Sequence, residues 1–270
     1  MRARALTLLL ATACSSTTAG TTTPSPTALH PAPSPTATAT RTTKPLGVVI
    51  HRSVFGHSLQ GRELVAFRAG PTGAHRRLLV VGVVHGDETA GQAIAQALLR
   101  TAPPSTTEVV VVPDLNPDGV ARGTRQNARG VDLNRNFPYR WKGLGQRGDQ
   151  QYSGIGPLSE PESRAMAALI QGLRPTVSVW FHQPVGVIDE SGGSVPVESR
   201  FARILGLPLR RLRRYNGSAA SWENTSLPGT TAFVVELPRR VSASLRRRVL
   251  GGLRDLERSR ERGESGRGGE

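Results

Sequence analysis

The chain has 270 residues, which is enough for one sizeable domain or two small ones. Its formal net charge is +15, and Cys14 is its single cysteine, so no disulfide can form within one chain. A charge of this size can mark a nucleic-acid-binding protein. No interleaving of aromatic and basic residues and no recognition motif supports that class, so we expect no nucleic-acid partner.

The first residues have the pattern of an export signal. Arg2 and Arg4 precede the apolar run ALTLLLATA, which ends just before Cys14; this order is typical of a short secretory signal. The position of Cys14 resembles a bacterial lipoprotein signal, in which that cysteine is lipidated. Because Ala11 stands where such signals usually carry leucine, plain secretion stays open. We therefore predict a signal peptide at 1–14 and a location at the outer face of the cytoplasmic membrane or in the cell wall.

Two further segments are too polar to bury a core. Residues 15–45 are almost entirely Thr, Ser, Pro and Ala and are predicted to form a disordered tether, and 258–270 a disordered polar tail. The folded part is then one domain at 46–257. For an exported protein, the positive charge suits anionic cell-wall polymers as partners, with membrane contact only through an N-terminal lipid anchor. The densest basic run, at 209–214, fits either a solvated face or a binding face.

The folded part alternates between apolar runs and amphipathic segments. Glu63–Arg68 predicts a strand, and a turn at 70–73 leads to a Val-rich strand at 77–84. After it we predict a helix at 89–100, a strand at 108–112 and a long loop at 113–158. A helix then runs from an N-cap at Ser159 to Gly172, followed by a strand at 176–181 and an irregular stretch at 183–230. The last predicted elements are a strand at 231–235 and a helix at 242–257. This alternation predicts a single-domain α/β fold with a mixed, largely parallel sheet and helices on both faces.

His85 and Glu88 lie at the predicted strand-to-helix turn, three residues apart. In open α/β sheets that edge is where ligands bind. An imidazole and a carboxylate suit Zn²⁺, which keeps one position open for water in catalytic sites. The pair alone is a weak signal, because His85 can simply cap the turn while Glu88 benefits from the helix dipole.

His182 and Glu236 each follow an apolar strand in the same way. If the strands are parallel neighbours, both side chains meet His85 and Glu88 at one edge of the sheet. Three ligands and a free carboxylate are what a hydrolytic zinc needs, since the carboxylate takes a proton from the water that the metal activates. His182 alone fits a core histidine better than a ligand, but a carboxylate directly after the run TAFVV would be costly to bury without a partner.

Several motifs resemble the zinc carboxypeptidase family, and they occur in the family's order over residues 85–236. They are His85-x-x-Glu88, Asn116-Pro117-Asp118-Gly119, Thr124-Arg125-Gln126-Asn127, the run from Gly130 to Pro138 (GVDLNRNFP), His182 within WFHQP and Glu236 within FVVELP. The resemblance implies that His85, Glu88 and His182 bind one Zn²⁺ and that Glu236 activates the water.

The resemblance also implies roles for the residues around the metal. Arg125 would polarise the scissile carbonyl, and Asn134 and Arg135 would hold a substrate carboxylate. Tyr215 matches the family's mobile substrate tyrosine, although the spacing in 205–230 differs and Tyr215 can equally pack at the edge. For the segment around Asn134 the alternative is a purely structural network of turns.

Within the family, the compact length and the HGDE and FHQP forms are most similar to members that cleave γ-D-glutamyl–meso-diaminopimelate bonds of peptidoglycan peptides. The Arg-rich region 183–230 has few aromatic residues, so a pocket for a large apolar side chain is not expected. The alternatives left open are a general metallocarboxypeptidase with another C-terminal specificity, an acyl-amino-acid deacylase, and a non-catalytic wall-binding lipoprotein.

Overall fold

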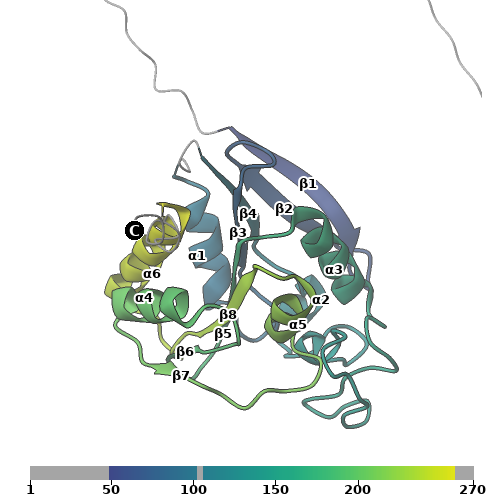
Figure 1. Cartoon of the computed structure of the whole chain (residues 1–270). Coiled ribbons are helices and arrows are strands. Elements are labelled where there is room, and N and C mark those ends of the chain that lie inside the picture. Colours follow the sequence, from purple (N-terminus) through teal and green to yellow (C-terminus); the bar gives the residue numbers. More distant parts are fainter. Residues whose placement is uncertain (1–48, 102–105, 259–270) are drawn as a thin grey trace, which may run out of the picture. The chain divides into compact units, whose positions relative to one another are not determined.

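Eight strands form one mixed sheet in the computed structural model, which describes residues 49–101 and 106–258 (Figure 1). The strands are β1 (Ile50–His57), β2 (Glu63–Ala69), β3 (Arg76–Val81), β4 (Thr107–Val112), β5 (Val177–His182), β6 (Val187–Asp189), β7 (Leu209–Arg210) and β8 (Thr231–Glu236). Their order in the sheet is β1-β2-β4-β3-β5-β8-β6-β7. The centre, β4-β3-β5-β8, is parallel, whereas β1, β2 and β6 join through antiparallel pairs. The predicted mixed, largely parallel sheet is confirmed.

Three neighbouring strands, β3, β5 and β8, bring the predicted site together. They run parallel, so their carboxyl ends share one edge of the sheet. Residues His182 and Glu236 are register partners at the last position of β5 and β8. Because side chains of register partners lie on the same face of a sheet, the two are direct neighbours.

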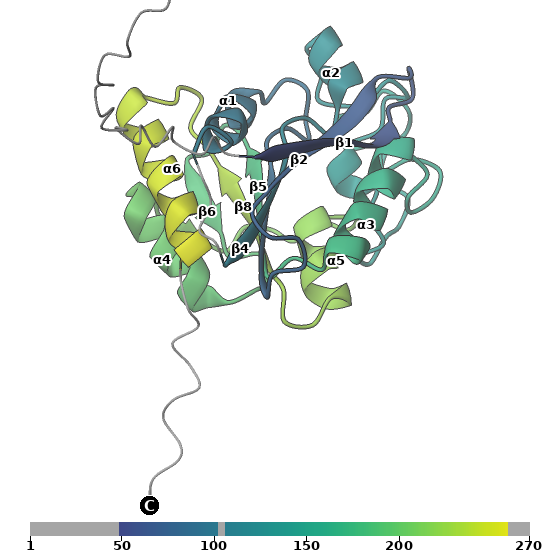
Figure 2. The ribbon, with the colours of Figure 1, turned by 90° about the horizontal axis from the view of Figure 1, so that it is seen from above.

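The helices cover both faces of the sheet (Figures 1 and 2). One face packs against α1 (Ala90–Leu98), α4 (Val195–Leu205) and α6 (Ala243–Arg258), and the other against α3 (Pro161–Leu173) and α5 (Ala219–Ser226). A short helix, α2 (Pro117–Arg122), and a 3-10 turn at Leu133–Arg135 interrupt the long loop after β4. The buried apolar residues therefore form two cores, one on each side of the sheet.

The structure corrects three sequence predictions, two at the ends of elements and one for a whole segment. Strand β3 ends at Val81, so His85 lies beyond the strand and not at its tip. The N-cap of α3 is Glu160, while the Ser159 hydroxyl donates to the Glu160 carboxylate at 2.9 Å. The segment 183–230 is not irregular, since it contains β6, α4, β7 and α5.

Helix α4 has recognisable signals in its sequence, although no helix was predicted there. Pro196 lies in its first turn, Phe201 and Leu205 are buried four residues apart, and Gly206 adopts the left-handed conformation of a helix C-cap at φ +65°. Strand β1 carried almost no signal, because it is an edge strand whose residues are mostly exposed.

The predicted signal peptide with Cys14, the tether at 15–45 and nearly all of the tail at 258–270 lie outside the described residues. Among the residues that are described, no helix is long and apolar enough to cross a membrane.

A buried carboxyl beneath the sheet predicts an unusual pH dependence of stability. Glu223 on α5 is fully buried beside Trp180, whose indole Nε1 lies 3.4 Å from one carboxylate oxygen. Burial raises the pKa of Glu223 to about 8. The folded state thus keeps a proton that the unfolded chain releases near pH 4.5, and stability from this group falls as pH rises from about 4.5 to about 8.

The substitution Glu223→Gln removes this titration. We expect the variant to match the wild type near pH 4.5 and to exceed its free energy of unfolding by on the order of 4 kcal/mol at pH 8. Urea unfolding of both zinc-loaded proteins at the two pH values measures the difference. An equal pH dependence in wild type and variant would show that the Glu223 carboxyl is ionised in the folded protein.

Candidate metal centre and active site

Three side chains form a group that can hold a metal ion. One ligand atom from each of His85, Glu88 and His182 lies within 4.8 Å of the other two, and all three residues are buried. Nδ1 of His85 and Nδ1 of His182 are each 3.0 Å from Oε2 of Glu88. Two nitrogens and one oxygen are a donor set that zinc accepts, and a fourth position remains for water or substrate. The residues present therefore fit a zinc ion.

The turn that carries His85 needs glycine for a close backbone approach. A Cβ on Gly86 would lie 2.0 Å from the backbone carbon of Gly119, so only glycine fits where this turn crosses α2. Asn116 joins the same elements: its side chain caps α2 and donates to the carbonyls of Val84 and Arg125, both at 3.1 Å. The motif Asn116–Gly119 is thus a support for the turn of His85 and not a set of reacting groups.

Asp132 orients the metal group, although no role was predicted for it. Its Oδ1 is 3.0 Å from Nε2 of His85, which leaves Nδ1 of that ring facing Glu88 and His182. Its Oδ2 accepts from Nε and Nη2 of Arg125 at 3.1 and 2.9 Å. Carboxylates that hold the far nitrogen of a ligating histidine fix its tautomer and orientation. Asp132 lies inside the GVDLNRNF motif, but only the fold shows which groups it contacts.

Charge pairing sets the protonation of this cluster. Burial would raise the pKa of Asp132, but His85 and Arg125 outweigh it and hold that pKa well below its usual range. Burial would lower the pKa of His85, but Asp132 and Glu88 raise it above its usual value. The pKa of Glu88 is likewise held far below its usual range by His182 and His85, against the effect of burial. Both carboxylates are therefore ionised, as a metal centre requires.

Arg125 points into the metal group. Its Nη1 donates to Oε1 of Glu88 at 2.9 Å, while the rest of the guanidinium is paired with Asp132. The neighbouring Asn127 instead bonds Glu160 and Glu162 and shapes the loop. Within the motif 124–127, Arg125 is thus the side chain that reaches the candidate metal ligands.

Asn134, Arg135 and Tyr215 gather next to the metal group. The Asn134 amide nitrogen is 3.4 Å from Nε2 of His182, and its oxygen accepts from the backbone nitrogen of Ala219 at 2.9 Å. The guanidinium carbon of Arg135 lies 4.0 Å from the centre of the Tyr215 ring. The structure therefore brings Tyr215, the residue with the least regular spacing, to the predicted carboxylate-binding arginine.

Arg135 is a buried cation with unused donors. Its side chain donates from Nη1 to the Asn134 carbonyl, and no described residue accepts from its buried Nε. Burial lowers the pKa of Arg135, because a charge that is kept away from water is costly. Gly217 holds the segment in place, since a Cβ there would lie 1.9 Å from the Arg135 carbonyl oxygen. A buried guanidinium with free donors suits an anionic ligand.

Glu236 is the free carboxylate of the site. It is not one of the three candidate metal ligands, and its Oε2 is buried with no hydrogen-bond partner among the described residues. The backbone nitrogen of Leu237 donates to the His182 carbonyl at 2.8 Å, which holds the ends of β5 and β8 together. An unpaired carboxylate oxygen beside a metal group is suited to accept a proton from water.

The fold and this site are those of a zinc-dependent hydrolase, and residues 47–189 match the sequence profile of the zinc carboxypeptidase family. The chain belongs to this family. It is 36% identical to murein peptide amidase A of Escherichia coli strain K12 over 181 residues, which cover 62% of this chain and 74% of the relative. The identity to murein peptide amidase A of Vibrio campbellii is 35% over 221 residues, covering 75% and 85%.

Solved structures agree with this assignment. Murein-tripeptide amidase from Escherichia coli O157 superposes with a TM-score of 0.62 at 32% identity, covering 77% of this chain and 92% of that one. Carboxypeptidase A from Helicoverpa armigera has a TM-score of 0.66 at 17% identity, covering 77% and 68%, which shows the fold alone. The predictions of family, fold class, enzyme class and zinc cofactor are confirmed.

Proposed function

We propose that the protein hydrolyses the γ-D-glutamyl–meso-diaminopimelate bond of peptidoglycan peptides. The observation that carries this proposal is a buried, incompletely paired Arg135 that follows Asn134, whose amide nitrogen lies 3.4 Å from the candidate ligand His182. Arg135 thus offers a place for a carboxylate next to the hydrolysed bond. The similarity to two murein peptide amidases supports the same substrate class. Diaminopimelate carries two carboxylates, so an Arg-rich site suits it.

In this proposal, His85, Glu88 and His182 hold the zinc ion. When bound, zinc lowers the pKa of a water molecule to about 7 and polarises a carbonyl oxygen. Asp132 keeps the His85 ring in the tautomer that presents Nδ1, since it occupies Nε2.

Glu236 acts as the proton carrier. Its unpartnered Oε2 takes the proton of the attacking water and then returns it to the nitrogen of the leaving amine. Arg125 stabilises the negative charge that develops on the carbonyl oxygen, because Glu88 and Asp132 hold its fixed positive charge beside the candidate zinc ligands.

Asn134 and Arg135 bind and orient the carboxylate of the residue that is released. Free guanidinium donors can form paired hydrogen bonds to it, and Asn134 offers its amide beside His182. Tyr215 covers Arg135 and shields the bound carboxylate from water.

The test uses the zinc-loaded protein, the tripeptide L-Ala-γ-D-Glu-meso-diaminopimelate and a set of ordinary peptides, with products identified by mass spectrometry. We expect release of diaminopimelate from the tripeptide and no cleavage of the others. Removal of zinc with a chelator should abolish the reaction, and added Zn²⁺ should restore it.

Other outcomes would contradict parts of the proposal. Release of ordinary C-terminal residues would keep the zinc chemistry and assign a general carboxypeptidase specificity. No cleavage of any peptide would favour the non-catalytic wall-binding alternative, and activity that is indifferent to chelators would contradict the zinc mechanism.

We propose further that the protein is exported and anchored through a lipid on Cys14. The support is the charged and apolar order of residues 1–14, which are outside the described part of the chain. We expect the full-length protein to partition into the detergent phase of a Triton X-114 extraction and to incorporate labelled fatty acid. Cys14→Ser should abolish both, because it removes the only thiol. Equal labelling of the two proteins would exclude this anchor.

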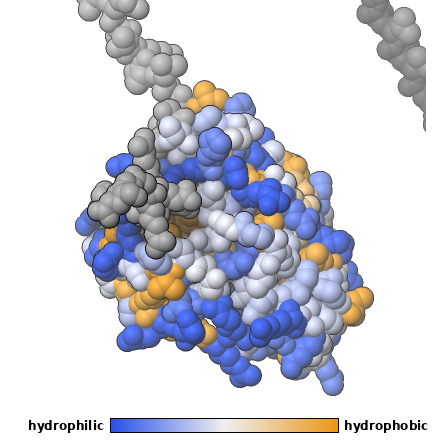
Figure 3. All heavy atoms as spheres, viewed as in Figure 1, coloured by the Kyte–Doolittle hydropathy of each residue, from blue (hydrophilic) through white to orange (hydrophobic). Residues whose placement is uncertain are grey.

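Anionic cell-wall polymers are a further proposed partner. The support is the net charge of +15 together with the hydrophilic residues that cover much of the face in Figure 3. The basic run 209–214 is partly used within the fold, since Arg211 pairs with Glu190 and Arg214 donates to the carbonyls of Glu190 and Ser191. The Glu190 carboxylate therefore offsets one positive charge of this run, while Arg214 keeps its charge because carbonyl groups are neutral.

A further inference from the structure

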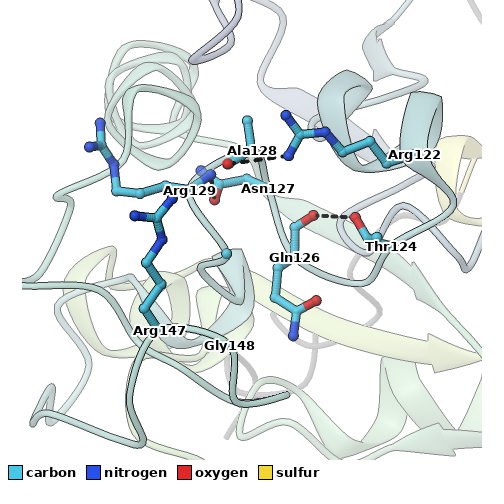
Figure 4. Close-up of a pocket in the computed structure, with 9 residues that line it drawn as sticks. Arg122, Thr124, Gln126, Asn127, Ala128, Arg129, Arg147 and Gly148 are labelled. Atoms are coloured by element: carbon cyan, nitrogen blue, oxygen red, sulfur yellow. Dashed lines mark hydrogen bonds between the residues drawn. The ribbon is translucent and has the colours of Figure 1, made fainter.

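A polar pocket outside the metal group lies on the segment that carries Arg125. It has a volume of about 440 Å³, within the range of pockets that bind small molecules. Its lining residues come from the end of α2, from the loop after it and from the turn near 147 (Figure 4), and they are Arg122, Thr124, Gln126, Asn127, Ala128, Arg129, Gly130, Arg147 and Gly148. Three are arginines and none is acidic.

The three arginines are incompletely paired. Arg122 donates from Nη1 to the Ala128 carbonyl at 3.2 Å, and Arg129 donates only from Nε, to Glu160 at 3.1 Å. Arg147 makes no hydrogen bond or ion pair with any described residue. Figure 4 draws Arg129 and Arg147 on one side of the pocket and Arg122 on the other. At least two guanidinium groups can thus turn free terminal nitrogens towards a ligand.

The pocket is separate from the metal centre, but the same loop carries residues of both. Thr124 and Gln126 line the pocket, whereas Arg125 between them bonds Glu88 and Asp132. Asn127 also lines it and fixes the loop through Glu160 and Glu162. These bonds brace the loop that carries Arg129, which itself donates to Glu160. An anion bound among the guanidinium groups that line the pocket would offset their like charges.

We propose that this pocket binds an oxyanion, a phosphate or a carboxylate group, carried by a larger anionic molecule. Guanidinium groups pair with the two oxygens of either group through parallel hydrogen bonds. The Thr124 hydroxyl donates to the Gln126 carbonyl, and the Gln126 amide nitrogen donates to the Asp149 carbonyl, so both side chains line the pocket as neutral polar groups. The size of the pocket admits more than a single inorganic ion. Binding at this pocket would not need zinc, whereas the proposed hydrolysis does. An experiment can therefore contradict the anion site without contradicting the hydrolysis, and the reverse.

The test follows binding of inorganic phosphate and of tricarballylate to the zinc-loaded protein by ¹H–¹⁵N NMR. We expect the backbone signals of 122–130 and 147–148 to shift with either probe. Arg147→Gln should weaken binding at these signals about tenfold, the effect of losing one charged pair of hydrogen bonds. The double variant Arg129→Gln/Arg147→Gln should weaken it further. Arg247→Gln is the matched control, since Arg247 is an exposed arginine of α6 outside the pocket.

The NMR signals that shift identify where the anion binds, and the relative affinities of the two probes identify the class of ligand. Tighter binding of phosphate would assign a phosphate-bearing polymer, and tighter binding of tricarballylate a peptide with several carboxylates; both support the site. Shifts confined to residues around Arg135 would overturn it, because the anion would then occupy only the carboxylate site of the active centre. Equal binding by Arg147→Gln, Arg247→Gln and wild type would overturn it as well.

Discussion

Replacing Glu236 by glutamine will lower the turnover number for the tripeptide by about 10³-fold or more, in the range expected for the loss of a general base. Glutamine has nearly the same shape but cannot take a proton from water. Zinc content should not change, because Glu236 is not among the three residues whose ligand atoms converge. Steady-state kinetics of the zinc-loaded variant, with metal content measured by mass spectrometry, provides the test.

The control for this variant is Glu223→Gln, which makes the same chemical change in a buried carboxyl that contacts Trp180. The Glu223→Gln variant should keep a turnover number within about threefold of the wild type, because a core substitution that preserves side-chain shape acts mainly on stability. If Glu236→Gln kept near wild-type turnover while Glu223→Gln lost it, the proton carrier would have been assigned to the wrong residue. Unequal zinc content would instead make Glu236 a ligand.

Replacing Asp132 by asparagine will weaken zinc binding by about 10- to 100-fold, the usual effect of losing a carboxylate that orients a ligating histidine. Asp132 accepts from His85, from Arg125 and from the backbone nitrogen of Asn134. Asparagine replaces one of the two accepting oxygens by an NH₂ group, which is a donor. This NH₂ group would face either the His85 ring or the Arg125 guanidinium, which also donate, so one of these hydrogen bonds is lost. Competition with a zinc-binding fluorescent chelator at fixed pH measures the affinity.

Asp118→Asn separates this effect from general loss of stability. Asp118 is equally buried, accepts from the Ser58 hydroxyl at 2.8 Å and the Gln60 backbone at 3.0 Å, and pairs with Arg62. Both variants should lower the melting temperature, but only Asp132→Asn should weaken zinc binding. Equal zinc affinities of the two variants would contradict the orienting role of Asp132.

Sequence patterns alone determined the strands that carry the site. Apolar runs mark β3, β4, β5 and β8, because strands that are buried on both faces carry mostly apolar residues. Polar residues at the ends of two of these runs, His182 and Glu236, stood out for the same reason. The parallel order of β3, β5 and β8 then brought them to one edge, as expected.

The supporting contacts were decided only by the tertiary structure. Asp132 contacts His85, which lies 47 positions earlier in the chain. Tyr215 contacts Arg135 from a segment whose motif spacing differs from that of the family. Local patterns report burial and backbone preference, but in loops they do not specify where a side chain points. That direction depends on close approaches such as that of Gly217 to Arg135, which form only when distant segments pack together.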